Sequence, residues 1–269
     1  MGIYLINTIR RIIFKFIFKS LYLYELGIFF ARYTNFLLPH EEDVYGLNYL
    51  KLEKEKNIID VGASDGLYYK SLRYMGIKNK YNAFEPLKKN KKYLIKIKKK
   101  NINFKFHITA LGDKNTQLTL YTPFYKKHFL YNWSSFSIKE CKYNLLLRNF
   151  NINLKKLEFK KHNVKQKRLD FFKFKPALIK IDVEGYENSV LLGAIKTIKK
   201  FKPIIYVENN LKQKKSNTIN FFKQKLLKLG YNAYTFNFEQ KTFLNYNKRN
   251  ISGRFFSYNV YFITKDHFR

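Results

Sequence analysis

The 269-residue sequence contains one cysteine, one tryptophan, five prolines and few acidic residues. The single cysteine, Cys141, excludes an intrachain disulfide and a cysteine-rich zinc site. A chain without disulfides fits a reducing compartment, so the sequence predicts a cytoplasmic location. A chain of this length can form one α/β domain with a complete hydrophobic core and a terminal extension.

Acidic residues number 19 against 53 lysines and arginines, which gives a formal net charge of +34. Such an excess can indicate nucleic-acid binding, because lysine and arginine displace counterions from phosphates. The lysines occur in every segment, however, as in residues 88–100 and 196–202, and the joint abundance of Lys, Asn, Ile, Tyr and Phe is typical of A/T-rich codons. We therefore interpret the charge as a general attraction for anionic surfaces and do not expect a nucleic-acid partner.

Long apolar runs are absent as well. Residues 3–38 are rich in Ile, Leu, Phe and Tyr, but charged residues interrupt them before the roughly 20 apolar residues that a bilayer-spanning helix needs. Every fourth residue from Asn7 to Lys19 is polar and would form one stripe on a helix. The sequence predicts an amphipathic helical extension over residues 1–45. Two roles stay open: packing on the main domain or on a second subunit of a homodimer, and peripheral contact of residues 3–38 with an anionic membrane at its inner face.

From residue 57 onward, short apolar runs alternate with longer amphipathic stretches, which predicts βαβ units and a mostly parallel sheet with helices on both faces. The predicted strands are Asn57–Val61, Tyr81–Phe84, 103–109, 177–183 and 204–208. The predicted helices are 66–75, 87–99, 187–199 and 217–229.

The rest of this region follows two other patterns. Residues 231–238 and 254–264 alternate aromatic and polar side chains, which predicts two closing strands that pair antiparallel. Residues 121–167 are rich in Asn, Lys and aromatics without a strong period, so we predict an irregular insertion that covers the functional site as an acceptor lid. The main domain then spans residues 46–269.

The first predicted strand runs directly into a turn that contains Gly62 and Gly66 and then into a helix, an arrangement in which backbone can approach a nucleotide cofactor closely. Glycine at both positions is expected to leave space for the ligand. The turn lacks the G-x-G-x-x-G and Gly-Lys-Ser/Thr patterns, so neither a dinucleotide nor a triphosphate is favoured. Glu85 ends the next strand, where a carboxylate can accept hydrogen bonds from the hydroxyls of an adenosine ribose.

A second group of residues lies at the end of the strand predicted for 177–183. Strand alternation places Lys180, Asp182 and Glu184 on one face. Charged residues at the carboxyl end of a central strand are costly to bury without partners or function, and ligands of such sheets bind there. These acids and Glu208 could also hold a divalent ion through oxygen ligands, but no tight spacing motif supports a metal site, and none is predicted.

Together these blocks resemble FkbM-type methyltransferases in order and spacing over residues 57–210. The blocks are Asp60-Val-Gly-Ala-Ser-Asp-Gly66, Phe84-Glu-Pro86, Ala110-Leu-Gly112, Arg168-Leu-Asp170, Lys180-Ile-Asp-Val-Glu-Gly-Tyr-Glu187 and Val207-Glu208. The resemblance implies a class I methyltransferase Rossmann-like α/β fold with a seven-stranded sheet, S-adenosylmethionine as donor, and O-methylation, often in glycan or secondary-metabolite pathways. The donor-binding residues that it implies are Asp60, Gly62, Ala63, Ser64, Gly66, Glu85, Pro86, Ala110, Leu111 and Asp182. Ser64 stands where the family usually has Asn.

We therefore expect a methyltransferase that acts on a hydroxyl of a small-molecule, sugar, glycan or glycolipid acceptor. Asp182 and Glu184 are the candidate general bases, and Lys180 acts with them or forms a purely structural ion pair. In the lid, His128 is a weaker candidate base, and Trp133 is either a platform for a sugar ring or a packing anchor. Two alternatives stay open: a ribose O-methyltransferase acting on RNA, and a non-catalytic membrane-associated interaction protein.

Overall fold

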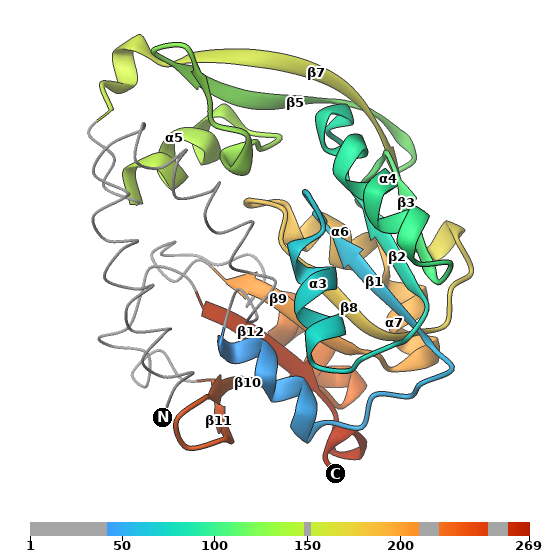
Figure 1. Cartoon of the computed structure of the whole chain (residues 1–269). Helices are drawn as coiled ribbons and strands as arrows, with labels where there is room; N and C mark the ends of the chain where they lie inside the picture. The colour runs from blue at the N-terminus through green and yellow to red at the C-terminus, as the bar shows by residue number, and fades with distance from the viewer. Residues whose placement is uncertain (1–41, 148–151, 210–220, 247–257) are drawn as a thin grey trace.

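The computed structural model describes residues 42–147, 152–209, 221–246 and 258–269, which form a mixed α/β fold with two sheets (Figure 1). Most of the extension predicted for residues 1–45, including the polar stripe and the membrane contact, lies outside these residues. Residues 42–45 of this extension are described, and they form the start of the 3₁₀ helix η1 (Glu42–Tyr49). Within the described ranges, no helix is both long and apolar enough to cross a membrane.

The larger sheet has eight strands in the order β11-β10-β12-β9-β8-β1-β2-β3. Their bounds are β1 (Asn57–Val61), β2 (Tyr81–Phe84), β3 (Phe104–His107), β8 (Pro176–Ile181), β9 (Ile204–Asn209), β10 (Asn232–Asn237), β11 (Thr242–Asn245) and β12 (Tyr258–Ile263). In this sheet β9, β8, β1, β2 and β3 are parallel neighbours. The remaining strands, β12, β10 and β11, pair antiparallel. The predicted α/β fold is confirmed, and the sheet is mixed, with its parallel strands together at one side. The predicted number of seven strands is wrong, because the four-residue β11 adds a hairpin partner to β10.

The antiparallel pairing predicted for the two closing strands is confirmed, with Asn232 opposite Ile263. The strand predicted for residues 103–109 is too long. β3 ends at His107, and the chain then enters the second sheet.

Helices cover both faces of the larger sheet, as predicted. Their bounds are α3 (Leu67–Tyr74), η2 (Lys88–Asn90), α4 (Lys91–Lys100), η5 (Leu169–Phe171), α6 (Glu187–Gly193), α7 (Ile195–Phe201), the π-helical turn η6 (Phe222–Leu226), η7 (Leu227–Leu229) and η9 (Lys265–His267). The helix predicted for residues 187–199 is broken at Ala194. Asp170 accepts hydrogen bonds there from the backbone nitrogens of Lys196 and Thr197, so its carboxylate caps a new helix start.

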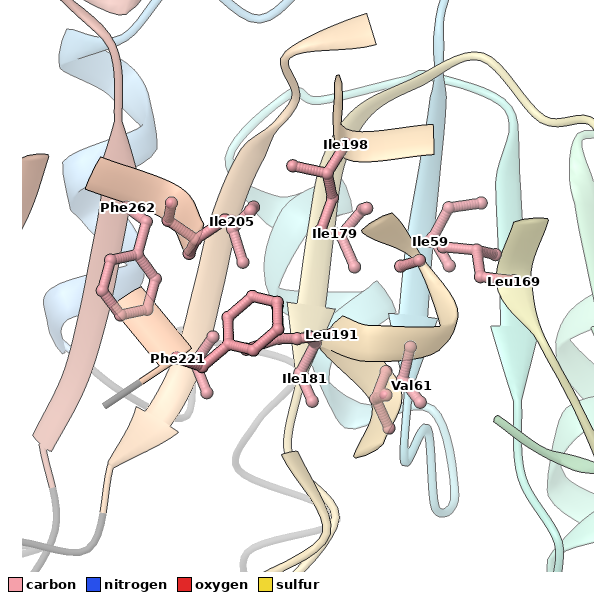
Figure 2. Packing of buried hydrophobic residues seen from close by; sticks show 14 of the residues in the cluster. Ile59, Val61, Leu169, Ile179, Ile181, Leu191, Ile198, Ile205, Phe221 and Phe262 are labelled. Atoms are coloured by element: carbon pink, nitrogen blue, oxygen red, sulfur yellow. The ribbon is translucent and has the colours of Figure 1, made fainter. Parts of the chain in front are cut away.

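Strand alternation divides the core into two clusters. On one face Ile59, Val61, Ile179 and Ile181 pack with residues of α6 and α7, as Figure 2 shows. On the other face, side chains such as Ile58 and Leu178 pack under α3 and α4. Burial on both faces explains why these strands are nearly continuous apolar runs in the sequence.

The segment predicted as an irregular insertion is instead largely ordered. The elements of this region are β4 (Ala110–Leu111), β5 (Thr116–Tyr125), β6 (His128–Phe129), η3 (Tyr131–Trp133), α5 (Ile138–Leu147), η4 (Leu154–Lys156) and β7 (Glu158–Lys167), of which β4 and the start of β5 precede the predicted segment. The second sheet has the order β4-β7-β5-β6, and β5 pairs antiparallel with β7 along its length. Figure 1 shows these two strands beyond the carboxyl ends of the parallel strands. The sequence did not predict β7, because Val164 is its single aliphatic residue and the alternation of its side chains gives almost no hydrophobic pattern.

Candidate functional site

The order of the parallel strands reverses between β1 and β8. From β1 the chain adds β2 and then β3 on one side, whereas β8 and then β9 lie on the other. In open α/β sheets, ligands bind outside the carboxyl ends of the strands at such a reversal. The residues predicted from the sequence follow the ends of β1, β2 and β8 and therefore meet at this edge.

Glu85 joins the turn after β1 to the end of β2. Its carboxylate accepts a hydrogen bond from the backbone nitrogen of Ser64 at 2.8 Å and another from that of Leu87 at 2.8 Å. The residue is 4% exposed. Burial raises the pKa of Glu85 to about 7, against the opposing effect of these hydrogen bonds. A hydrogen bond thus joins the glycine turn to the carboxylate at the end of the next strand.

The glycines of this turn are required by the protein itself, and the space that they are expected to leave for a ligand stays a prediction. Gly62 has a φ of 80°, and a Cβ atom on it would lie 1.8 Å from the backbone oxygen of Asp182. Gly66 has a φ of 84°, and its Cβ would lie 2.3 Å from the Cδ1 atom of Ile97. The backbone of Asp182 therefore excludes a side chain at Gly62, and the left-handed conformation disfavours one at Gly66. Ser64 also has a positive φ of 48°, a region in which the Asn usual in this family is enriched.

Lys180 lies between two of the predicted acids. Its Nζ atom is 3.3 Å from Oδ1 of Asp60 and 3.2 Å from Oδ2 of Asp182, and it donates to the backbone oxygen of Gly62 at 3.2 Å. Asp60 is 0% exposed and also accepts a hydrogen bond from the Tyr81 hydroxyl at 2.7 Å. Lys180 therefore has the structural role that the sequence left open, because it holds the turn after β1 against the end of β8. Its contact with an acceptor stays a prediction.

The loop after β8 is held by a residue to which the sequence analysis gave no role. β8 ends at Ile181, so the strand predicted for 177–183 is too long, and Asp182 and Glu184 lie in the loop. Oε1 of Glu187 accepts hydrogen bonds from the backbone nitrogens of Gly185 at 3.0 Å and Val183 at 3.3 Å. Burial raises the pKa of Glu187 to about 7. Its place within the Lys180–Glu187 block was the only sequence signal.

This raised pKa predicts how stability depends on pH. Between pH 4.5 and 7 the folded state binds a proton at Glu187 that the unfolded state releases, so the stabilising contribution is complete below pH 4.5 and is lost as the pH rises through 7. Glu187→Gln keeps the accepting oxygen but does not titrate. From pH 5 to pH 8 we expect its free energy of unfolding to gain about 2.5 kcal/mol relative to the wild type. Urea unfolding of both proteins at the two pH values measures this gain, and equal pH dependence would contradict it.

Tertiary structure brings a third acid to the same edge. One carboxylate oxygen each from Asp182, Glu184 and Glu208 lies within 4.8 Å of the others. Glu208 belongs to β9, the parallel neighbour of β8. Oxygen atoms at this spacing are of the type that could hold Mg²⁺ or Ca²⁺, an arrangement that sequence spacing alone did not support.

Other sequence-selected residues occupy different positions. Ala110 and Leu111 form β4, pair with β7 and are buried by protein side chains, so they mark the passage from one sheet to the other. Pro86 lies between Glu85 and the start of η2. Trp133 is 4% exposed and packs with Leu145, which favours a packing anchor over a sugar platform. His128 lies in β6, at the edge of the second sheet.

A family model, the methyltransferase FkbM domain, matches residues 60–233, and no curated protein matches the chain. A similar solved structure is the FkbM methyltransferase of Methylobacillus flagellatus KT, with 14% identity, a TM-score of 0.46, and coverage of 80% of this chain and 45% of that chain. The present chain therefore spans less than half the length of that protein.

Two further solved structures are similar at lower scores. The precorrin-6y C5,15-methyltransferase of Geobacter metallireducens GS-15 has 11% identity, a TM-score of 0.37, and coverage of 83% of this chain and 87% of that chain. The Methanococcus jannaschii fibrillarin pre-rRNA processing protein has 14% identity, a TM-score of 0.39, and coverage of 79% and 68%. The family model spans more than half of the sequence, including the end of β1, all of β2 and β8, and the residues that meet at the ends of these strands. The chain therefore belongs to the FkbM methyltransferase domain family.

Proposed function

We propose that the protein is an S-adenosylmethionine-dependent O-methyltransferase whose acceptor hydroxyl belongs to a sugar, glycan or glycolipid. The observation that carries the proposal is the 2.8 Å hydrogen bond from the Ser64 nitrogen to Glu85 at the reversal of strand order. It joins a glycine turn and a buried carboxylate at the edge where such sheets bind nucleotide-like ligands.

The residues present fit the donor. Glu85 accepts hydrogen bonds from Ser64, Leu87 and the Asn90 side chain, and a carboxylate has roughly four acceptor positions, so it can still accept a ribose hydroxyl. Gly62 and Ser64 both have positive φ angles, and their turn lets backbone approach a ligand closely. When bound, S-adenosylmethionine supplies an electrophilic methyl group on a sulfonium. The protein's part is to hold the acceptor oxygen in line with that methyl group at near-attack distance.

Glu184 is the better of the two candidate bases. Asp182 shares the Lys180 ammonium at 3.2 Å, and a paired cation makes a carboxylate a weaker proton acceptor. Glu184 instead receives a hydrogen bond at 2.7 Å from the neutral side chain of Asn144. As the methyl–oxygen bond forms, the acceptor's hydroxyl proton would pass to the carboxylate of Glu184.

The charge at this edge supports a neutral, hydroxyl-rich acceptor. Asp182, Glu184 and Glu208 place three carboxylates close together, and the nearby Lys180 is already shared with Asp60. Sugar hydroxyls can donate hydrogen bonds to carboxylates, whereas the phosphates that flank each ribose of RNA would be repelled. This observation favours a glycan over the RNA alternative, although the protein as a whole is basic.

Glu85→Gln is expected to weaken donor binding by about 10- to 100-fold, because an amide loses one accepting oxygen and the charge that strengthens hydrogen bonds from the ribose. Wild-type affinity should also rise as the pH increases through 7, where Glu85 ionises. Calorimetric titration with S-adenosylmethionine measures both effects. Glu239→Gln, which removes a charge from an exposed turn, is the matched control. Unchanged affinity in Glu85→Gln would count against the donor site.

The acceptor class is tested with methyl-labelled S-adenosylmethionine and separate glycan, lipid and RNA fractions of the host cell. We expect the glycan or glycolipid fraction to gain label. Labelling of RNA alone would support the ribose methyltransferase instead. Absence of donor binding in the titration would support the non-catalytic alternative.

A further inference from the structure

Helix α5 and the segment before it, residues 134–137, contact the loop that carries the candidate base. The Ser135 hydroxyl donates to the backbone oxygen of Glu184 at 2.8 Å. The side-chain nitrogen of Asn144, in α5, donates to Oε2 of the same residue at 2.7 Å. The rings of Phe136 and Tyr186 lie 4.6 Å apart between centroids. The backbone and the carboxylate of Glu184 are thus both held from outside the larger sheet.

Glu184 needs such support for two reasons. Its φ of 52° lies in the left-handed region, which is costly for a residue with a side chain and persists where neighbours hold it. Its carboxylate also lies beside those of Asp182 and Glu208, and like charges repel. A hydrogen bond from Asn144 offsets that repulsion at one oxygen and fixes the direction of the other.

Asn144 is itself rigidly placed. It is 6% exposed, and the next residue, Leu145, packs with Trp133 in a buried cluster. On the preceding turn the buried Cys141 donates from Sγ to the backbone oxygen of Tyr121. Burial raises the pKa of Cys141 to about 12, so its thiol adds no charge beside Glu184. An amide on a helix held in this way can orient a carboxylate with little freedom of its own.

We infer that Asn144 is a positioning residue for methyl transfer, which orients the Glu184 carboxylate towards the acceptor from the lid. The inference rests on the proposed function and adds α5 to the machinery that the larger sheet provides. A neutral amide suits this role because it directs the carboxylate without pairing it with a cation, whereas Lys180 pairs with Asp182. α5 also brings a charged residue to this loop, Glu140, whose side chain lies against Gly185.

The isosteric variant Asn144→Asp tests the inference. It preserves the shape of the side chain but replaces the donating N–H by an acceptor oxygen opposite Glu184. We expect turnover at saturating acceptor to fall by about 10- to 100-fold, because small displacements of a catalytic group cost this much. Asn144→Ala should show a similar fall. Turnover is measured as label transferred from S-adenosylmethionine to increasing amounts of the host glycan fraction.

Two further measurements separate a positioning role from a structural one. Donor affinity by calorimetry should stay close to the wild type in both Asn144 variants, and Asn103→Asp, a matched change on an exposed turn, should keep full turnover. Asn144→Asp adds a charge beside buried carboxylates and is expected to lower the melting temperature. Asn144→Ala adds no charge, so its turnover is compared with the wild type at a temperature at which both proteins are folded. Wild-type turnover in Asn144→Asp, or a fall matched by lost donor affinity, would overturn the inference while leaving the proposed function intact. If the wild-type protein binds donor but labels no fraction, the proposed function fails, and the inference fails with it.

Discussion

Replacing Lys180 by methionine is expected to lower the free energy of unfolding by about 3 to 5 kcal/mol. Lys180 is 7% exposed, and its ammonium lies 3.3 Å from Asp60, which is fully buried. Methionine has a similar volume, so the cost comes from leaving a carboxylate charge in the interior without its cation. The hydrogen bond from Tyr81 to the other oxygen of Asp60 compensates for only part of that loss.

Urea unfolding of Lys180→Met measures the effect. The double variant Asp60→Asn/Lys180→Met should recover part of the stability, because it removes the stranded charge and retains an acceptor for Tyr81. Lys56→Met is a matched control whose partner, Glu53, is exposed, so its loss should stay below about 1 kcal/mol. If Lys180→Met and Lys56→Met lose equal free energy of unfolding, the buried Lys180–Asp60 pair contributes no more to stability than the exposed pair.

Gly62→Ala is expected to destabilise the protein by about 3 to 5 kcal/mol and to abolish donor binding. A left-handed conformation costs alanine about 1 to 2 kcal/mol. The remainder arises because the new Cβ atom would lie 1.8 Å from the Asp182 oxygen, so the loop after β8 must move. That movement also separates Lys180 from the backbone oxygen of Gly62, to which it donates.

Gly76→Ala measures the cost of the left-handed backbone conformation alone. Gly76 has a φ of 77°, similar to that of Gly62, but a Cβ atom on it would have no neighbouring atom within 4 Å. Its loss should therefore be about 1 to 2 kcal/mol, with donor affinity unchanged. Chemical denaturation and calorimetry on both variants make the comparison. If the two substitutions cost the same, the close approach of β1 and β8 does not contribute.

The contrast between overall and local charge is informative about the site. Acidic residues number 19 in a chain with a net charge of +34, so a codon bias towards lysine cannot account for where they gather. Six of them meet at the edge formed by the ends of β1, β2, β8 and β9, namely Asp60, Glu85, Asp182, Glu184, Glu187 and Glu208. Several are buried, and burying carboxylates is unfavourable unless they are bonded or functional. This concentration therefore supports the site more strongly than the basic surface supports an anionic partner.

Local patterns in the sequence determined the βαβ region and the edge at which its motifs meet. Buried parallel strands appear as short apolar runs, and a glycine turn or a strand-end acid such as Glu85 is visible wherever it occurs. Parallel strands share their carboxyl edge, so motifs following β1, β2 and β8 had to meet.

Tertiary structure alone decided the remaining features. The order of strands placed Glu208 beside Asp182. The close approach of the Asp182 backbone to Gly62 made a glycine necessary there. Strand β7 of the second sheet has too few apolar residues for the sequence to indicate a strand. Asn144 and Glu184, which form a hydrogen bond, are 40 residues apart in the sequence. The physical reason is that periodicity reports only which face of an element is buried. Which distant side chain completes a charge or a hydrogen bond depends on how those faces pack.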